Sequence, residues 1–225
     1  MKLASFDIFD TTLLRRCGKP EAVFHLLAER LFPNDKDLRE AFVVWRKSTK
    51  GNTLEDVYDK IDSAFLTFAR KNKEDMMKAE EETEKDVLIA NPSVCKLIDQ
   101  RRIEGYNIAF ISDMYLNSQF LRKVLQRNGC CRQEDAIYVS CEHNARKDTG
   151  LLYKVVRNEL HPTEWIHYGD NIRSDIKMAK SKGIRAIHIN TCHNNAERAC
   201  SQVSTSMAEL ARQYRLRHKD NEFAA

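Results

Sequence analysis

The sequence lacks three features that would place the protein outside the interior of a cell. Its seven cysteines are odd in number and form no C-x-x-C pair, so neither a disulfide framework nor a zinc ribbon is indicated. No apolar run approaches the length that crosses a bilayer, and the amino terminus reaches a charged strand end too soon for a secretory leader. We therefore expect a cytoplasmic protein with reduced thiols and no membrane contact.

Internal repeats, low-complexity tracts and a strong excess of one charge are also missing. Of the 225 residues, 31% are charged and 42% are hydrophobic, which is an ordinary globular balance. The net charge of +4 suits an anionic small substrate, but lysine and arginine alternate with acids throughout the chain. We therefore expect no nucleic-acid partner. The length allows one large domain, or a core with a smaller inserted domain.

The first part of the chain combines one short strand with a long helical segment. Residues 3–6 form an apolar run that ends at Asp7, as a buried strand would. Helical spacing of apolar residues follows over 20–32, over 38–45 and over 53–68, where Phe65 and Phe68 lie at core positions, and a charged helix is expected over 71–86. No strand is expected between Gly18 and Ala90.

The second part alternates between strands and helices. Apolar runs predict strands over 106–111, 136–139, 165–168 and 186–189, and helical patterns fall over 93–104, 118–127, 149–159 and 174–182. This alternation predicts an α/β fold with a Rossmann-like parallel sheet. We expect a core of residues 1–16 and 91–195, an inserted all-helical cap over 17–90, and a basic helical tail over 196–225.

Polar side chains follow four of these strands, where each strand ends. In a doubly wound parallel sheet such ends meet at one edge, so the side chains can converge. Carboxylates there are the hard oxygen ligands that suit Mg²⁺, and a carboxylate can also attack phosphorus and carry an aspartyl phosphate. The candidate residues, in chain order, are Asp7, Asp10, Thr11, Ser112, Asp113, Lys147, Asp170, Asn171 and Asp175.

Four motifs in this order resemble the haloacid dehalogenase (HAD) superfamily of phosphohydrolases. The family's Asp-x-Asp-x-Thr corresponds to residues 7–11, its strand-ending Ser or Thr to Ser112, its lysine before a helix to Lys147, and its Gly-Asp with an acid five residues on to residues 169–175. The resemblance covers essentially the whole chain. The opening motif is also similar to predicted hydrolases that accompany bacterial surface-polysaccharide enzymes, which would suggest a sugar or polyol phosphate.

The resemblance implies specific roles for these residues. Asp7 would be the nucleophile, assisted by Asp10 and Thr11, and Mg²⁺ would be held by Asp7, Asp170, Asp175 and the backbone carbonyl of Phe9. The substrate, a small phosphorylated metabolite, would be bound by Ser112, Asp113, Lys147 and Asn171. A shifted register, with Asp10 as nucleophile, is the alternative; Asp7 is preferred because the strand ends there.

One position departs from the phosphatase pattern. Phe9 stands where those enzymes carry the aspartate that protonates the leaving group, and dehalogenating members carry an aromatic residue there. Those members usually lack the full pair of acids that Asp170 and Asp175 provide. Loss of a general acid typically costs 10²–10⁴ in rate, so anhydrides or acyl phosphates would be favoured, unless Asp10 replaces the missing acid.

Three functions therefore remain open: a Mg²⁺-dependent phosphohydrolase or phosphotransferase, which is favoured; a weakly catalytic phospho-ligand-binding domain that works with a partner enzyme; and a metal-independent 2-haloacid dehalogenase. Purely structural roles also remain open for single residues. Ser112 and Asp113 would then cap the helix that starts near Ser118, Asp175 would serve a helix start, and His167 would be a satisfied core histidine.

Overall fold

A computed structural model describes residues 1–17 and 19–190, and the expected basic tail at 196–225 lies outside the described residues. The residues divide into two compact units. One comprises Met1–Leu14, Gly51–Val57 and the described residues from Ile89 onward. The other comprises the described residues of Arg15–Lys50 and Tyr58–Leu88. Residues 51–57, which lie inside the segment expected as the cap, group with the first unit.

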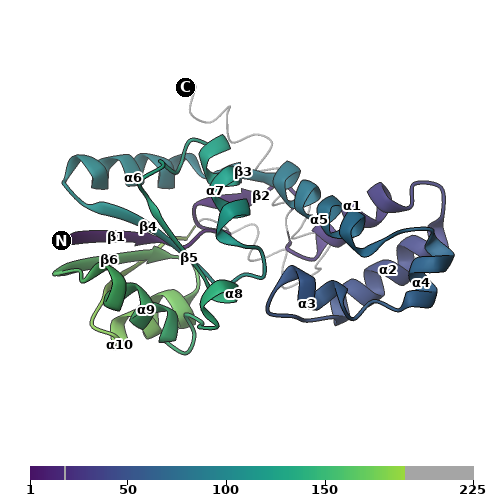
Figure 1. Ribbon diagram of the computed structural model, residues 1–225. Helices are drawn as coiled ribbons and strands as arrows, with labels where there is room; N and C mark the ends of the chain where they lie inside the picture. Colours follow the sequence, from purple (N-terminus) through teal and green to yellow (C-terminus); the bar gives the residue numbers. More distant parts are fainter. Residues whose placement is uncertain (18, 191–225) are drawn as a thin grey trace, which may run out of the picture. The chain divides into compact units, whose positions relative to one another are not determined.

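The first unit contains a five-stranded sheet of order β5-β4-β1-β6-β7 in which all neighbours are parallel. This confirms the predicted α/β parallel-sheet fold. Figure 1 shows α6 and α7 on one side of the sheet and α9 and α10 on the other. The strands are β1 (Lys2–Phe6), β4 (Asn107–Ser112), β5 (Ala136–Val139), β6 (Glu164–Gly169) and β7 (Arg185–His188). The helices of residues 92–181 are α6 (Pro92–Ile103), α7 (Ser118–Arg127), α8 (Ser140–His143), α9 (Leu151–Leu160), η1 (Ile172–Met178) and α10 (Ala179–Ser181).

The sheet is buried because its strands are apolar on both faces. Leu3 and Trp165 pack with Tyr153 and Val156 of α9 on one face. On β1 and β6, Phe6 and Tyr168 stack with ring centroids 4.8 Å apart. Parallel strands covered on both faces read as continuous apolar runs, which is why the sequence located them well.

The second unit is predominantly helical. Its aromatic core joins Phe32, Phe42, Trp45 and Tyr58 through successive ring contacts. A fully buried carboxylate, Glu80, accepts hydrogen bonds from Arg46 and Tyr58 within this unit. The helices of the insert are α1 (Ala22–Leu31), α2 (Lys36–Ser48), α3 (Leu54–Tyr58, mostly in the first unit), α4 (Ser63–Ala69) and α5 (Lys73–Val87).

Three expectations for the elements were wrong. The single helix expected over 53–68 is two helices, because the Asp62 side chain caps a new start by accepting from Ala64 N, and Phe68 is 76% exposed rather than in the core. A short strand was missed: β3 (Leu88–Ala90) forms a two-stranded sheet with β2 (Leu13–Arg15). The helix expected over 174–182 begins earlier, as the π-helical turn η1.

Candidate active site

The loop after β1 places Asp7 at the carboxyl end of the central strand. Asp7 continues the strand's hydrogen bonding, since its N–H donates to Tyr168 O at 2.8 Å. The loop then turns back, with Thr12 Oγ1 donating to Asp7 O at 2.7 Å. Asp10 adopts a left-handed conformation at φ 57°, which Asp tolerates better than most residues. Such strained backbone is common at functional sites.

Three carboxylates from two strand ends converge. One oxygen from each of Asp7, Asp170 and Asp175 lies within 4.8 Å of the others. Asp7 and Asp175 are buried, and Asp170 is partly buried. This is the arrangement that the sequence predicted for the strand ends after β1 and β6.

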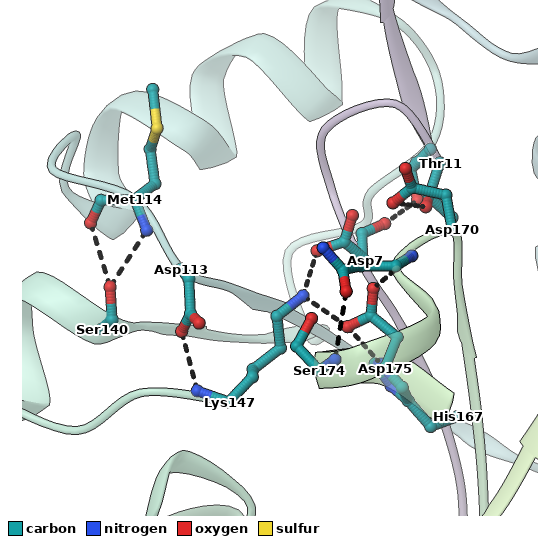
Figure 2. A network of polar contacts seen from close by, with 12 residues as sticks. Asp7, Thr11, Asp113, Met114, Ser140, Lys147, His167, Asp170, Ser174 and Asp175 are labelled. Carbon is teal, nitrogen blue, oxygen red and sulfur yellow. Dashed lines mark hydrogen bonds and ion pairs between the residues drawn. The ribbon is translucent and has the colours of Figure 1, made fainter. Parts of the chain in front are cut away.

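Lys147 lies between two of these acids, as Figure 2 shows. Its Nζ contacts Asp7 Oδ1 and lies 2.7 Å from Asp175 Oδ1. Burial acts to lower the pKa of the Lys147 ammonium, but the carboxylates of Asp7 and Asp175 raise it well above its usual range. Lys147 is therefore charged and neutralises one of the two carboxylates beside it.

Lys147 does not neutralise all three carboxylates, and the pKa values of these acids depend on the negative charge that remains. Burial raises the pKa of Asp7 well above its usual range; Lys147 opposes this, and repulsion from Asp175 and Asp170 adds to it. Burial, with repulsion from Asp10 and Asp175, raises the pKa of Asp170 to about 6. In Asp175 burial acts in the same direction, but Lys147 and His167 outweigh it, and the pKa lies below its usual value.

These residues line a cavity of about 410 Å³ in the first unit. Six of its lining residues are acids and three are bases. Hard, closely spaced carboxylates with an excess of negative charge are the donor set that Mg²⁺ prefers, so the residues fit the ion that the resemblance of the four motifs implies. The lining residues are Asp7, Phe9, Asp10, Ser112, Asp113, Arg146, Lys147, Asp148, Asp170, Asn171, Arg173, Ser174 and Asp175.

Every predicted site residue except Thr11 lines this cavity. Thr11 is fully buried, and its Oγ1 donates to Asp170 Oδ1 at 3.3 Å. It therefore orients Asp170 instead of facing a substrate. Phe9, at the position of the missing acid, is partly exposed and lies on the cavity wall.

The structure excludes the helix-cap alternative for the residues after β4. The cap of α7 is Asn117, whose side chain accepts from Phe120 N at 2.9 Å. Asp113 instead accepts from Lys147 N at 2.8 Å, and this bond fixes the loop that presents the lysine. Ser112 is 2% exposed and lines the cavity.

Asn171 starts η1 and thereby orients Asp175. Its side chain accepts from the N–H groups of Arg173 and Ser174, and its own N–H donates to Asp175 Oδ2 at 3.1 Å. Gly169 makes room for the same carboxylate, because a Cβ at that position would lie 2.5 Å from Asp175 Cβ. The sequence indicated Asn171 as a substrate-binding residue; in the structure Asn171 shapes the loop and also lines the cavity.

Sequence reasoning missed two residues that touch the site. His167 is the buried, hydrogen-bonded core histidine that the sequence predicted, and its Nε2 also lies 3.3 Å from Asp175 Oδ1, a contact that the sequence did not reveal. Tyr153 of α9 donates to Ser174 O at 3.1 Å and lies 3.5 Å from Asp175 Oδ1. The only available signal for His167 was its place two residues before Gly169, on a strand that ends at the site.

Comparisons with known proteins locate relatives by structure alone. No family model matches the sequence, and no curated protein matches it. The L-2-haloacid dehalogenase from Xanthobacter autotrophicus is 16% identical, covering 96% of this chain and 88% of that one, with a TM-score of 0.59. An HAD family enzyme from Bacteroides thetaiotaomicron, in complex with magnesium and inorganic phosphate, is 14% identical, covering 87% and 97%, with a TM-score of 0.57.

A third structure, YfnB from Bacillus subtilis bound to magnesium, is 17% identical over 84% of this chain and 88% of that one, with a TM-score of 0.53. Within the described residues, no helix is long and apolar enough to cross a membrane. The sheet order, the helical insert between β1 and β4 and these structural matches together show that the chain has the fold of the haloacid dehalogenase superfamily.

Proposed function

We propose that the protein is a Mg²⁺-dependent phosphohydrolase or phosphotransferase that acts on a small phosphorylated metabolite. The observation that carries this proposal is the convergence of the Asp7, Asp170 and Asp175 carboxylates, two of which, Asp7 and Asp175, also contact the buried Lys147 ammonium. Dehalogenation needs no such set of ligands. Magnesium is present in two of the similar structures, which supports the choice.

The charge of the cavity supports a divalent cation. Six acids against three bases would repel a phosphate dianion, and Lys147 already compensates one carboxylate. When bound, Mg²⁺ would be held by Asp7, Asp170 and Asp175, with the Phe9 carbonyl expected as a further ligand, and would neutralise charge on a phosphate oxygen.

Asp7 would act as the nucleophile. A carboxylate oxygen of Asp7 attacks phosphorus, the bond from phosphorus to the leaving oxygen breaks, and the phosphoryl group becomes an aspartyl phosphate. Attack of water, or of an acceptor alcohol, on that phosphorus then releases the product and restores the carboxylate. Lys147 stabilises the ionised Asp7 before attack, and it lies where it can bind a phosphate oxygen afterwards.

Ser112 and Asn171 would bind the substrate, since both line the cavity, at the ends of the two strands (β4 and β6) that flank β1. Asp113 contributes by fixing the loop of Lys147 through a backbone hydrogen bond. This fixed geometry favours catalysis by positioning, which dominates in phosphoryl transfer.

This chain differs from the phosphatase pattern in the residue that would protonate the leaving group. Phe9 has no proton to give, so substrates with stable leaving groups, such as acyl or aryl phosphates, should react fastest. Asp10 lines the same cavity and is the acid that would supply a proton instead.

The test is a screen of aryl and acyl phosphates with and without EDTA, with a 2-haloacid as a parallel substrate. The proposal predicts phosphate release that chelation abolishes. Tight binding of a phosphate analogue without turnover would instead support the binding domain with a partner enzyme, a candidate that Phe9 favours. Halide release that survives EDTA would identify a dehalogenase.

A further inference from the structure

Three buried polar side chains on β1 and β6 extend from the site into the apolar core. Ser5, Trp165 and His167 are at most 5% exposed, and Ser5 is the register partner of His167. Polar groups in such surroundings cost free energy unless they are hydrogen-bonded. Their partners therefore define what this group does.

The hydrogen bonds of these side chains form a chain in which each donor faces toward the site, from Trp165 through Ser5 and His167. Trp165 Nε1 has only a hydrogen to give and donates it to Ser5 Oγ at 2.7 Å. The Ser5 hydroxyl lies 2.8 Å from His167 Nδ1 and can donate to it. A neutral imidazole that accepts at Nδ1 carries its proton on Nε2, which lies 3.3 Å from Asp175 Oδ1 and donates to it.

The opposite tautomer is unfavourable on both sides of the ring. Ser5 Oγ would then face two donors, Trp165 Nε1 and His167 Nδ1. The bare Nε2 would direct its lone pair at the carboxylate oxygen of Asp175.

The ring is also fixed in space. Tyr153 packs edge-on against His167 at 5.2 Å between ring centroids, and against Trp165 at 6.0 Å. The imidazole therefore cannot rotate without repacking the sheet face covered by α9. The ring nitrogen Nε2 faces Asp175 Oδ1, as Figure 2 shows for His167 and Asp175.

We propose that His167 is a positioning residue that holds Asp175 for divalent-cation binding, with Ser5 and Trp165 fixing the tautomer that lets it donate. His167, Lys147 and, at 3.5 Å, the Tyr153 hydroxyl approach Asp175 Oδ1, and Oδ2 accepts from the Asn171 N–H, so His167 is one of several donors that set the orientation of the carboxylate. Hydrogen bonds of this kind to metal-binding carboxylates typically govern metal affinity. The inference rests on the proposed function.

Two substitutions at His167 separate positioning from packing. In His167→Gln the side-chain amide nitrogen can take the place of Nε2 and still donate to Asp175. In His167→Asn the shorter amide can reach Ser5 but not Asp175. Calorimetric titration of Mg²⁺ into the full chain without substrate should show about 10–100-fold weaker binding for His167→Asn, and near wild-type binding for His167→Gln.

The tautomer is tested separately in the metal-free protein. Nitrogen-15 chemical shifts should show His167 protonated at Nε2 and bare at Nδ1, and Ser5→Ala should shift the population toward the other tautomer. A wild-type ring protonated at Nδ1 would overturn the inference, whatever the metal affinity.

The outcomes also separate this inference from the proposed function. Normal wild-type Mg²⁺ affinity with equal losses in His167→Asn and His167→Gln would overturn the positioning role alone. Absence of Mg²⁺ binding by the wild type would overturn both, even if the expected tautomer were observed.

Discussion

Lys147 Nζ lies 2.7 Å from Asp175 Oδ1 while also contacting Asp7, a residue 140 positions before the lysine in sequence, so one buried ammonium joins the two carboxylates. The lysine is on the loop before α9, whereas its two partners follow β1 and β6. The charge of Lys147 therefore acts on the proposed nucleophile, Asp7, and on a proposed metal ligand, Asp175, at the same time.

Replacing the lysine should destabilise the metal-free protein. Lys147→Met leaves two buried carboxylates without their cation, and removal of one partner from a buried pair typically costs about 3–5 kcal/mol. Urea unfolding in EDTA measures this loss. Lys154→Met, on the surface of α9, serves as the control, and a loss for Lys147→Met as small as the control's would contradict the electrostatic account.

The nucleophile can be assigned by a pair of conservative substitutions. Asp7→Asn should abolish phosphate release, because an amide does not attack phosphorus. Asp10→Asn should leave a measurable rate, since Asp10 is not at the strand end. A phosphate-release assay decides, and the reverse pattern would move the nucleophile to Asp10.

Restoring an acid at position 9 should depend on the leaving group. Phe9→Asp supplies the missing proton donor, and general-acid catalysis contributes about 10²–10⁴ in rate. The gain in kcat should appear with alkyl phosphates and be small with aryl phosphates, which need little protonation. Phe9→Asn is the matched control. Equal effects of the two substitutions on alkyl phosphates would show that proton donation at this position is not limiting.

Stabilisation of the protein by Mg²⁺ should increase with pH. The folded, metal-free pKa of Asp170 is about 6, above its unfolded value, so the folded state binds the proton more tightly. Ionisation of Asp170 therefore costs stability as pH rises from about 4 to 6, and the ionised form is the one that binds Mg²⁺.

Differential scanning fluorimetry with and without Mg²⁺ across this range tests the expectation. The Mg²⁺-induced rise in Tm should be small at pH 5 and larger at pH 7.5, and it should be lost in Asp170→Asn. A Mg²⁺-induced rise in Tm that is constant with pH in the wild type would mean that metal binding does not require ionisation of Asp170.

Much of the fold could be predicted because the polar residues of the motifs directly follow the apolar runs that form the strands. The apolar run before Asp7 and the Gly169–Asp170 pair located β1 and β6, and the alternation of elements gave a parallel sheet. The convergence of the three acids followed from that topology, since the carboxyl ends of parallel strands share an edge.

What could not be predicted depends on contacts between distant residues. The direction of the His167 hydrogen bonds depends on Ser5, which is 162 positions away in sequence. The break before α4 comes from a local cap at Asp62 that overrides a continuous helical pattern, and β3 is too short to be recognised without its partner.

The most direct test of the account is a crystal structure of the protein grown with Mn²⁺ in place of Mg²⁺, with data collected to show the anomalous signal of manganese. We predict a single strong peak among the carboxylates of Asp7, Asp170 and Asp175. Two results would contradict this account: well-ordered carboxylates with no manganese peak among them, or manganese bound elsewhere while these carboxylates pair only with Lys147.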